Sequence, residues 1–138
     1  EESLRQASEA AGHLSTSVDR CKAFIYSSPY TEEQLIELEA LTGRFARVSD
    51  LLIQKVLKTI ERLDGDTPGT VRDRILQAEK KGIITSAATL LDIRDVSNTI
   101  AHDYDDTSFN EIVLFVFQNT TLLLQVVQTA MQYSKKFY

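Results

Sequence analysis

The residues best suited to chemistry lie between Ile93 and Tyr104, where the sequence reads IRDVSNTIAHDY. A helix turns by about 100° per residue, so a helix over this segment would gather Arg94, Asn98 and His102 in one polar stripe. Tyr104 would fall at the edge of the neighbouring, core-facing side. The segment therefore places a cation, an amide and an imidazole close together.

This combination suits phosphodiester chemistry. An imidazole can exchange a proton near neutral pH, a guanidinium or an amide can hold a phosphate, and neither task requires a metal. The alternative is structural: Arg94 pairs with Asp95 or Asp103, and His102 caps the C-terminus of the helix, where a cation is favoured. Spacing alone makes the structural alternative the commoner one, and it identifies no substrate.

Acidic residues crowd the same helix end, at positions 103, 105 and 106. Their negative charge would raise the pKa of His102, which suits a general acid. The same charge would repel RNA phosphate unless Lys or Arg side chains of the second or third helix counter it. Such cations are present: the segment from Gly43 to Lys81 contains nine basic and six acidic residues, although the net charge of the whole chain is −5. A solvated helix face is the commoner explanation of such a segment, and an RNA-facing patch is the other.

Other functional signatures are missing. The sequence has no Gly-rich phosphate loop, no GxSxG, no HExxH and no paired CxxC. His13 lies in a polar stretch and is expected at the surface, and Cys21, the single cysteine, can form neither an intrachain disulfide nor a zinc site by itself. We therefore expect no metal and no cofactor.

Composition favours one globular domain. The chain has 138 residues, of which 43% are hydrophobic, and only 5 Gly and 2 Pro, too few for the turns of an all-β sandwich. The longest apolar run, Ile112 to Phe117, is far shorter than a membrane span, and the acidic N-terminal residues do not resemble a signal peptide. We expect a cytoplasmic location.

Periodicity and capping patterns predict five helices, over residues 2–27, 31–60, 70–81, 85–104 and 108–138. Capping boxes are predicted at Thr31 and Ser108, and Gly82 fits a left-handed stop after the third helix. The run from Ile112 to Phe117 is rich in β-formers, but it is expected to be helical because a lone strand would have no partner. Short loops between long helices predict an all-α, antiparallel up-down bundle.

Three stretches together resemble the HEPN-domain family, and within it the HepT-like toxins: LTGRFARVSDLL (41–52), GTVRDRILQAEKKGII (69–84) and IRDVSNTIAHDYDD (93–106). In the HEPN signature an Arg, usually followed by a polar residue such as Asn, precedes His by four to six intervening residues. The HepT form adds a Tyr two positions after the His, as in SNTIAHDY here.

The resemblance implies a homodimeric helical bundle that cuts RNA without metal, as the toxin of a toxin–antitoxin pair. Two copies of the motif helix would meet in a cleft, since one motif helix cannot surround a phosphate alone. His102 would be the catalytic imidazole and Asn98 a site-orienting amide. The antitoxin partner would be a minimal nucleotidyltransferase (MNT), which neutralises the toxin by adding AMP to Tyr104.

One position departs from the family pattern: Ser97 occupies the place of the motif Arg. Serine cannot carry the charge that grips a phosphate, and the loss of such a group costs roughly 10²–10³-fold in rate. Three explanations are open: an introduced substitution, a natural loss of nuclease activity, or replacement of the Arg by Arg94 one turn earlier. The first two favour, respectively, a disabled ribonuclease and a non-catalytic binding module that serves as substrate or adaptor for the nucleotidyltransferase.

Overall fold

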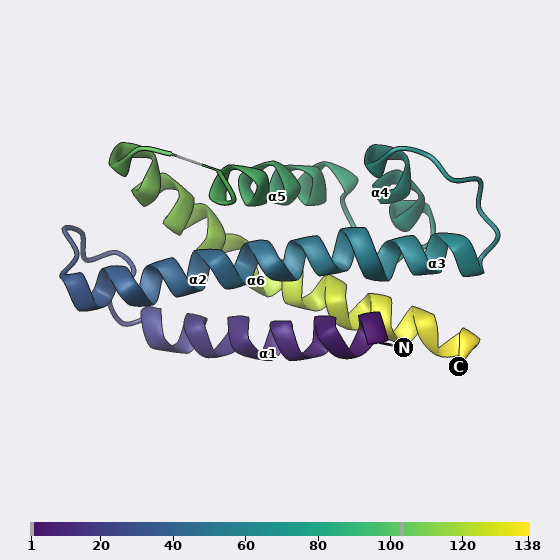
Figure 1. Ribbon diagram of the computed structural model, residues 1–138, viewed down its shortest axis with the longest axis horizontal. Coiled ribbons are helices and arrows are strands. Elements are labelled where there is room, and N and C mark those ends of the chain that lie inside the picture. The colour runs from purple at the N-terminus through teal and green to yellow at the C-terminus, as the bar shows by residue number, and fades with distance from the viewer. Residues whose placement is uncertain (1, 103) are drawn as a thin grey trace.

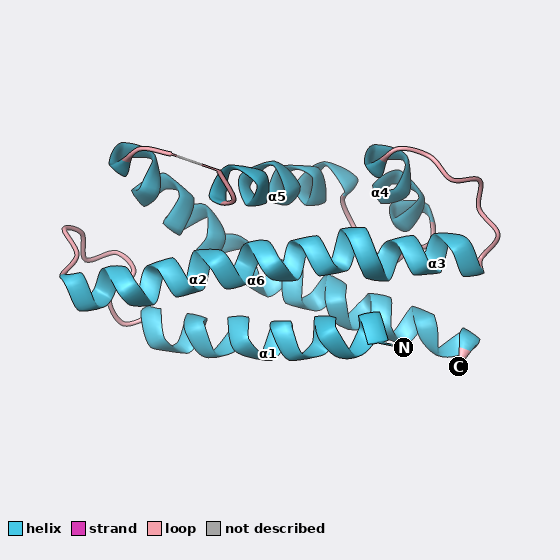
Figure 2. Cartoon of the chain, viewed as in Figure 1, coloured by secondary structure: helices cyan, strands magenta, loops and turns pink. Residues whose placement is uncertain are grey.

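The computed structural model describes residues 2–102 and 104–138, and every regular element in these ranges is helical (Figures 1 and 2). In chain order the elements are α1 (Glu2–Cys21), α2 (Glu32–Leu51), the π-helical turn η1 (Leu52–Val56), α3 (Leu57–Leu63), α4 (Val71–Lys80), α5 (Ala87–Ile100), α6 (Asp106–Ser134) and the 3₁₀ turn η2 (Lys135–Phe137). Because α2, η1 and α3 follow one another without a break, they form one long rod, and the described chain forms five rods. The predicted all-α bundle is confirmed.

The central rod, α2–η1–α3, organises the bundle. Its α2 portion contacts α1, α5 and α6, and Figure 1 shows α1 along one side of it and α5 along the other. The contacts are apolar: Leu38, Leu41, Phe45 and Val48 are fully buried. Burial of side chains of this size contributes about 1.5–3 kcal/mol each, so α2 supplies a large share of the core.

Capping residues fix where the helices begin. Thr31 and Thr70 each form a capping box, with Gln34 and Asp73 respectively, and Gly82 has a φ of 78° after α4. The predicted capping box at Ser108 is wrong, because α6 begins two residues earlier. Its N-cap is Asp105, whose carboxylate accepts a hydrogen bond of 2.9 Å from the backbone N–H of Ser108.

Two predicted helix ends are also wrong. The first helix ends at Cys21 and not at residue 27, because the chain then makes successive tight turns that bury Ile25. The fourth ends at Ile100 and not at Tyr104. The N–H of His102 bonds to the carbonyl of Thr99, three residues back, which tightens the last turn and stops the α-helix.

The last helix includes the β-rich run from Ile112 to Phe117, as predicted. By length and composition alone, the segment Ser108–Phe137 could cross a membrane. A core helix of a bundle passes the same test, and this one buries a continuous stripe that includes Val113, Val116, Leu123 and Val127.

The π turn η1 was not predicted, although the sequence carries a signal for it. The buried positions Val48, Leu52, Val56 and Ile60 follow one another in steps of four. Each such step overshoots a 3.6-residue turn by about 40°, so a regular helix would carry the seam away from the core. The wider π turn takes up this drift and keeps Val56 and Ile60 buried.

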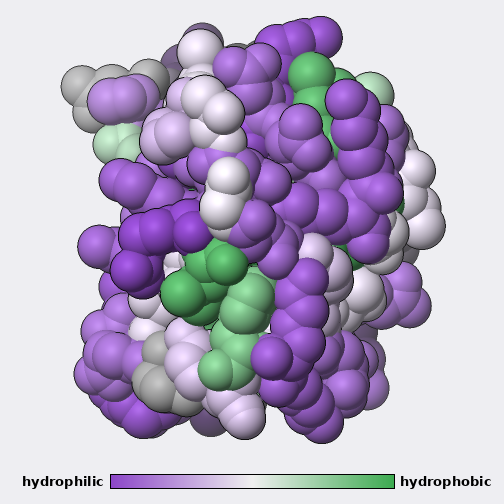
Figure 3. Space-filling view, turned by 90° about the vertical axis from the view of Figure 1, so that its right-hand side faces the viewer, coloured by the Kyte–Doolittle hydropathy of each residue, from purple (hydrophilic) through white to green (hydrophobic). Residues whose placement is uncertain are grey.

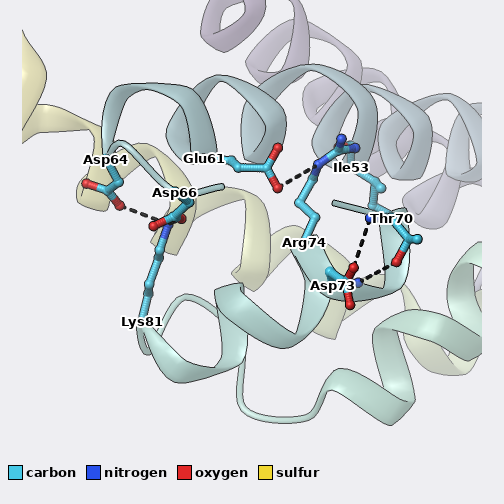
Figure 4. Close-up of polar contacts among 8 residues, drawn as sticks. All are labelled: Ile53, Glu61, Asp64, Asp66, Thr70, Asp73, Arg74 and Lys81. Carbon is cyan, nitrogen blue, oxygen red and sulfur yellow. Dashed lines mark hydrogen bonds and ion pairs between the residues drawn. The ribbon is translucent and has the colours of Figure 1, made fainter. Parts of the chain in front are cut away.

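Arg74 of α4 supports the π turn (Figure 4). Its Nη1 donates a hydrogen bond of 3.1 Å to the carbonyl of Ile53, and its Nε lies 3.7 Å from Oε2 of Glu61. Both charged side chains are more than nine-tenths buried. A carbonyl inside the bundle is thus satisfied by a guanidinium that another helix supplies.

A second polar cluster joins the end of α3 to α4 and to the C-terminal turn. Asp64 accepts hydrogen bonds from Tyr133 (2.5 Å) and Lys136, and it pairs with Lys81 at 2.9 Å. Burial raises the pKa of Asp64, but these three partners outweigh burial and hold the pKa at about 2.

Figure 3 shows the end of the bundle with the α3–α4 connection, where the surface is mostly hydrophilic around a small hydrophobic patch.

We expect Arg74→Ala to lower the free energy of unfolding by about 3–5 kcal/mol, because it leaves Glu61 as a buried charge without its partner. Urea denaturation measures this. Arg72→Ala is the matched control: Arg72 lies two residues earlier on α4 and is exposed, so its loss should cost less than about 0.5 kcal/mol. Equal losses for the two variants would contradict the role assigned to Arg74.

Candidate functional site

A hollow of about 440 Å³ lies between the central rod and α5, and we call it the motif groove. Its position follows from the packing of α5 against α2, which brings the motif helix alongside the first half of the rod. It is lined by Ala46, Arg47, Ser49, Asp50, Ile53, Gln54, Arg94, Ser97, Asn98 and Ala101.

The α5 wall of the motif groove carries three of the predicted site residues. Arg94, Ser97 and Asn98 are one turn or one residue apart, so they share a side of the helix. Asn98 is exposed and Arg94 is half-buried, whereas Ser97 is only 7% exposed. The Oγ of Ser97 is buried and has no hydrogen-bond partner among the described residues.

The buried hydroxyl of Ser97 is unusual, because buried polar groups are normally hydrogen-bonded and an unmade bond costs about 1–3 kcal/mol. Ser97 therefore lines the hollow, while its own hydroxyl is buried and nothing in the described chain satisfies it. A longer, donor-rich side chain at this position, such as the Arg of the family signature, would extend into a hollow that has room for it.

The facing wall comes from the central rod and contributes Arg47, Asp50 and Gln54. Arg47 is exposed and forms no ion pair within 4 Å with the described residues. Arg94, in contrast, forms an ion pair with its sequence neighbour: its Nη1 lies 3.8 Å from Oδ1 of Asp95. This is one of the two pairings that the structural alternative expected for Arg94. Asp103, the other partner considered for Arg94, lies outside the described residues.

His102 does not share the helical stripe that the sequence predicted. The helix ends at Ile100, so the ring lies beyond the C-cap Ala101, is exposed, and does not line the motif groove. It makes no side-chain hydrogen bond or ion pair with the described residues. A single chain thus brings together Arg94, Ser97 and Asn98 and leaves the imidazole at the edge.

Tyr104 packs against the core and is not free in solvent. It is half-buried, and its ring stacks on Phe109 with centroids 6.2 Å apart and planes 5° from parallel. Burial, and then the nearby charge of Glu39, raise the pKa of the Tyr104 hydroxyl. Asp105, one of the acids beside His102, is used as the N-cap of α6, and its hydrogen bonds with Ser108 lower its pKa.

Neither His13 nor Cys21 lines the motif groove. His13 is exposed, and its backbone carbonyl accepts a hydrogen bond from Arg44. Cys21 is buried, and burial raises the pKa of its thiol to about 11, which makes it a poor nucleophile. Across residues 2–102 and 104–138, no three His, Cys, Asp or Glu side chains are grouped as metal ligands.

The groove residues that sequence reasoning did not single out are Arg47, Asp50 and Gln54. Arg47 and Asp50 lie in the stretch LTGRFARVSDLL and within the basic segment. These two features indicated that the region matters but did not indicate which of its residues would line the site. Only the packing of α2 against α5 brings them to the motif.

A scan against protein-family models finds no match, and a search of curated proteins finds no significantly similar sequence. The resemblance to HEPN domains therefore stays a prediction, carried by the quoted residues.

We expect Ser97→Arg to fold with a free energy of unfolding within about 1 kcal/mol of the parent, because the new side chain can enter the motif groove. Ser17→Arg is the matched control, since Ser17 is also buried (1% exposed, against 7% for Ser97), accepts a hydrogen bond from Arg44 and lines none of the described hollows. There the arginine must displace packed atoms, at a cost of about 3 kcal/mol or more. Urea denaturation of both variants decides the matter, and equal destabilisation would show that position 97 has no such space.

Proposed function

We propose that this chain is a HepT-like endoribonuclease toxin with an impaired site, in which His102 is the catalytic imidazole and Ser97 replaces the motif cation. The observation that carries the proposal is the motif groove: Arg94, Ser97 and Asn98 line one hollow, and the buried hydroxyl of Ser97 has no partner among the described residues. The proposal includes a cytoplasmic location, where such a toxin would meet its RNA.

The chemistry needs few groups because RNA supplies its own nucleophile. The 2′-hydroxyl attacks the neighbouring phosphorus, and the 5′-oxygen of the next nucleotide leaves. An imidazole can move the proton in this exchange, and guanidinium and amide donors can stabilise the charge that develops on the phosphate oxygens. We assign the proton transfer to His102, and the stabilisation of phosphate charge to Arg94 and Asn98. The strongest expected donor, the Arg of the family signature, is missing because Ser97 occupies its position.

The proposed active form is a homodimer. His102 is exposed and lies outside the groove of its own chain, so one chain does not surround a phosphate. A second copy related by two-fold symmetry would bring a second motif helix, and with it a second imidazole and a second groove, to the same cleft. A dimer is therefore expected at tens of micromolar.

The alternative is a non-catalytic binding module for a minimal nucleotidyltransferase, and Ser97 is the observation that favours it. In this alternative the fold and dimer are kept while cleavage is lost. Both alternatives assign Tyr104 as the residue that receives AMP.

The assignment of Tyr104 is tested with Tyr104→Phe, which keeps an aromatic ring to stack on Phe109 and removes only the hydroxyl. With the cognate nucleotidyltransferase, ATP and Mg²⁺, we expect intact-mass analysis to show AMP on the parent and none on the variant. Tyr30→Phe is the control and should be modified like the parent, since Tyr30 donates its hydroxyl to the carbonyl of Ile25. AMP on the Tyr104→Phe protein would remove the assignment.

The nuclease proposal is tested by RNA cleavage in EDTA with three proteins: the chain itself, Ser97→Arg, and Ser97→Arg with His102→Ala. We expect weak or no cleavage from the first, at least 100-fold faster cleavage from the second, and loss of that gain in the third. His13→Ala in the Ser97→Arg background is the matched histidine control and should retain activity. Absence of cleavage from all of them, as folded dimers on varied RNAs, would favour the binding module.

A further inference from the structure

A second hollow adjoins the motif groove on the central rod. Its volume is about 380 Å³, and it is lined by residues of η1 and α3 and of the turn that follows them. Gln54 lines both hollows, so the two meet along one side of the rod. We call the second one the basic hollow, because it is lined by Lys55, Lys58 and Arg62.

The acids of the basic hollow already have partners. Glu61 pairs with Arg74, and Asp66 pairs with Lys81, which reaches it from the end of α4 (Figure 4). Lys55, Lys58 and Arg62, in contrast, are exposed and form no ion pair within 4 Å with the described residues. The positive charge of the hollow is thus left unbalanced by its own acids.

In the motif groove the row of unpaired cations continues through Arg47, beside Asp50, an exposed acid that likewise forms no ion pair within 4 Å with the described residues. From position 47 to position 62, the rod advances by about 22 Å at 1.5 Å per residue. Lys and Arg side chains along this length lie beside two connected hollows, and no aromatic side chain of the described residues lines either hollow. Such a surface fits a phosphate backbone better than it fits stacked bases.

We propose that Arg47, Lys55, Lys58 and Arg62 form a basic track that binds the backbone of a single RNA strand extending from the motif groove. The proposal rests on the proposed function and adds to it the path of the substrate. A local positive row also explains how a chain with a net charge of −5 can hold RNA beside the acids near His102. Each phosphate that a cation neutralises releases counterions, which favours binding at low salt.

An acidic protein surface is the other occupant of suitable charge, including a surface of a second copy of this chain. The position of the track favours RNA, because the row of cations leads directly into the motif groove. The test therefore measures RNA binding and self-association on the same proteins.

The test is fluorescence anisotropy of a labelled single-stranded RNA in EDTA, over a series of salt concentrations. Lys58→Gln with Arg62→Gln removes two track cations, and Lys80→Gln with Lys135→Gln removes two exposed cations that line neither hollow. We expect the track variant to bind at least tenfold more weakly and its salt slope to fall by about 1.4, at roughly 0.7 for each phosphate contact. The control should change affinity by less than about threefold.

Equal losses in the two variants would overturn the track, as would the absence of RNA binding by the parent. The proposal also fails if the track variant loses self-association in sedimentation while its RNA affinity is unchanged. If RNA binding depends on the track but Ser97→Arg cleaves nothing, the track stands and the nuclease fails. If Ser97→Arg cleaves RNA but the track variant binds RNA as tightly as the parent, the nuclease proposal stands and the track fails.

Discussion

Arg74 reaches from α4 into the side of the central rod, where its guanidinium donates to the carbonyl of Ile53 and faces Glu61. That contact holds the π turn, and the π turn sets the rotation of everything that follows along the rod. Without it, the four-residue steps of the apolar seam would turn away from the core. Because the seam stays buried, the opposite side of the rod, with its hollows and cations, stays open to solvent.

The distribution of charge separates structural from functional candidates among the basic residues. Arg74 and Lys81 are buried or nearly so and are ion-paired, and Arg44 hydrogen-bonds to Ser17 across to α1. Each of these cations ties two elements of the bundle together. Arg47 and the three cations of the basic hollow do not, and cations without a structural partner remain available for a ligand.

Features that depend on neighbouring residues could be predicted from the sequence. The five helices, the capping box at Thr31 and the left-handed Gly82 all follow from local pattern, and the structure confirms them. Two features of the site were missed. The motif helix ends at Ile100 because its last turn tightens, and this moved His102 out of the predicted stripe. The packing of the central rod against α5 brought Arg47 and Gln54 to the motif, and no spacing within the motif could have indicated this pairing, because it joins residues far apart in the chain.

The central claim is that RNA phosphate binds in the motif groove. The most direct measurement is an NMR titration of ¹⁵N-labelled protein with a short 2′-O-methyl RNA, which lacks the nucleophilic hydroxyl and stays intact. The account predicts that the perturbed amides cluster at Arg47, Gln54, Arg94 and Asn98. The hollow between α1 and α6, which includes Gly12 and Gln125, is the internal control and should be silent. Perturbations confined to that hollow, or none at all, would contradict the account.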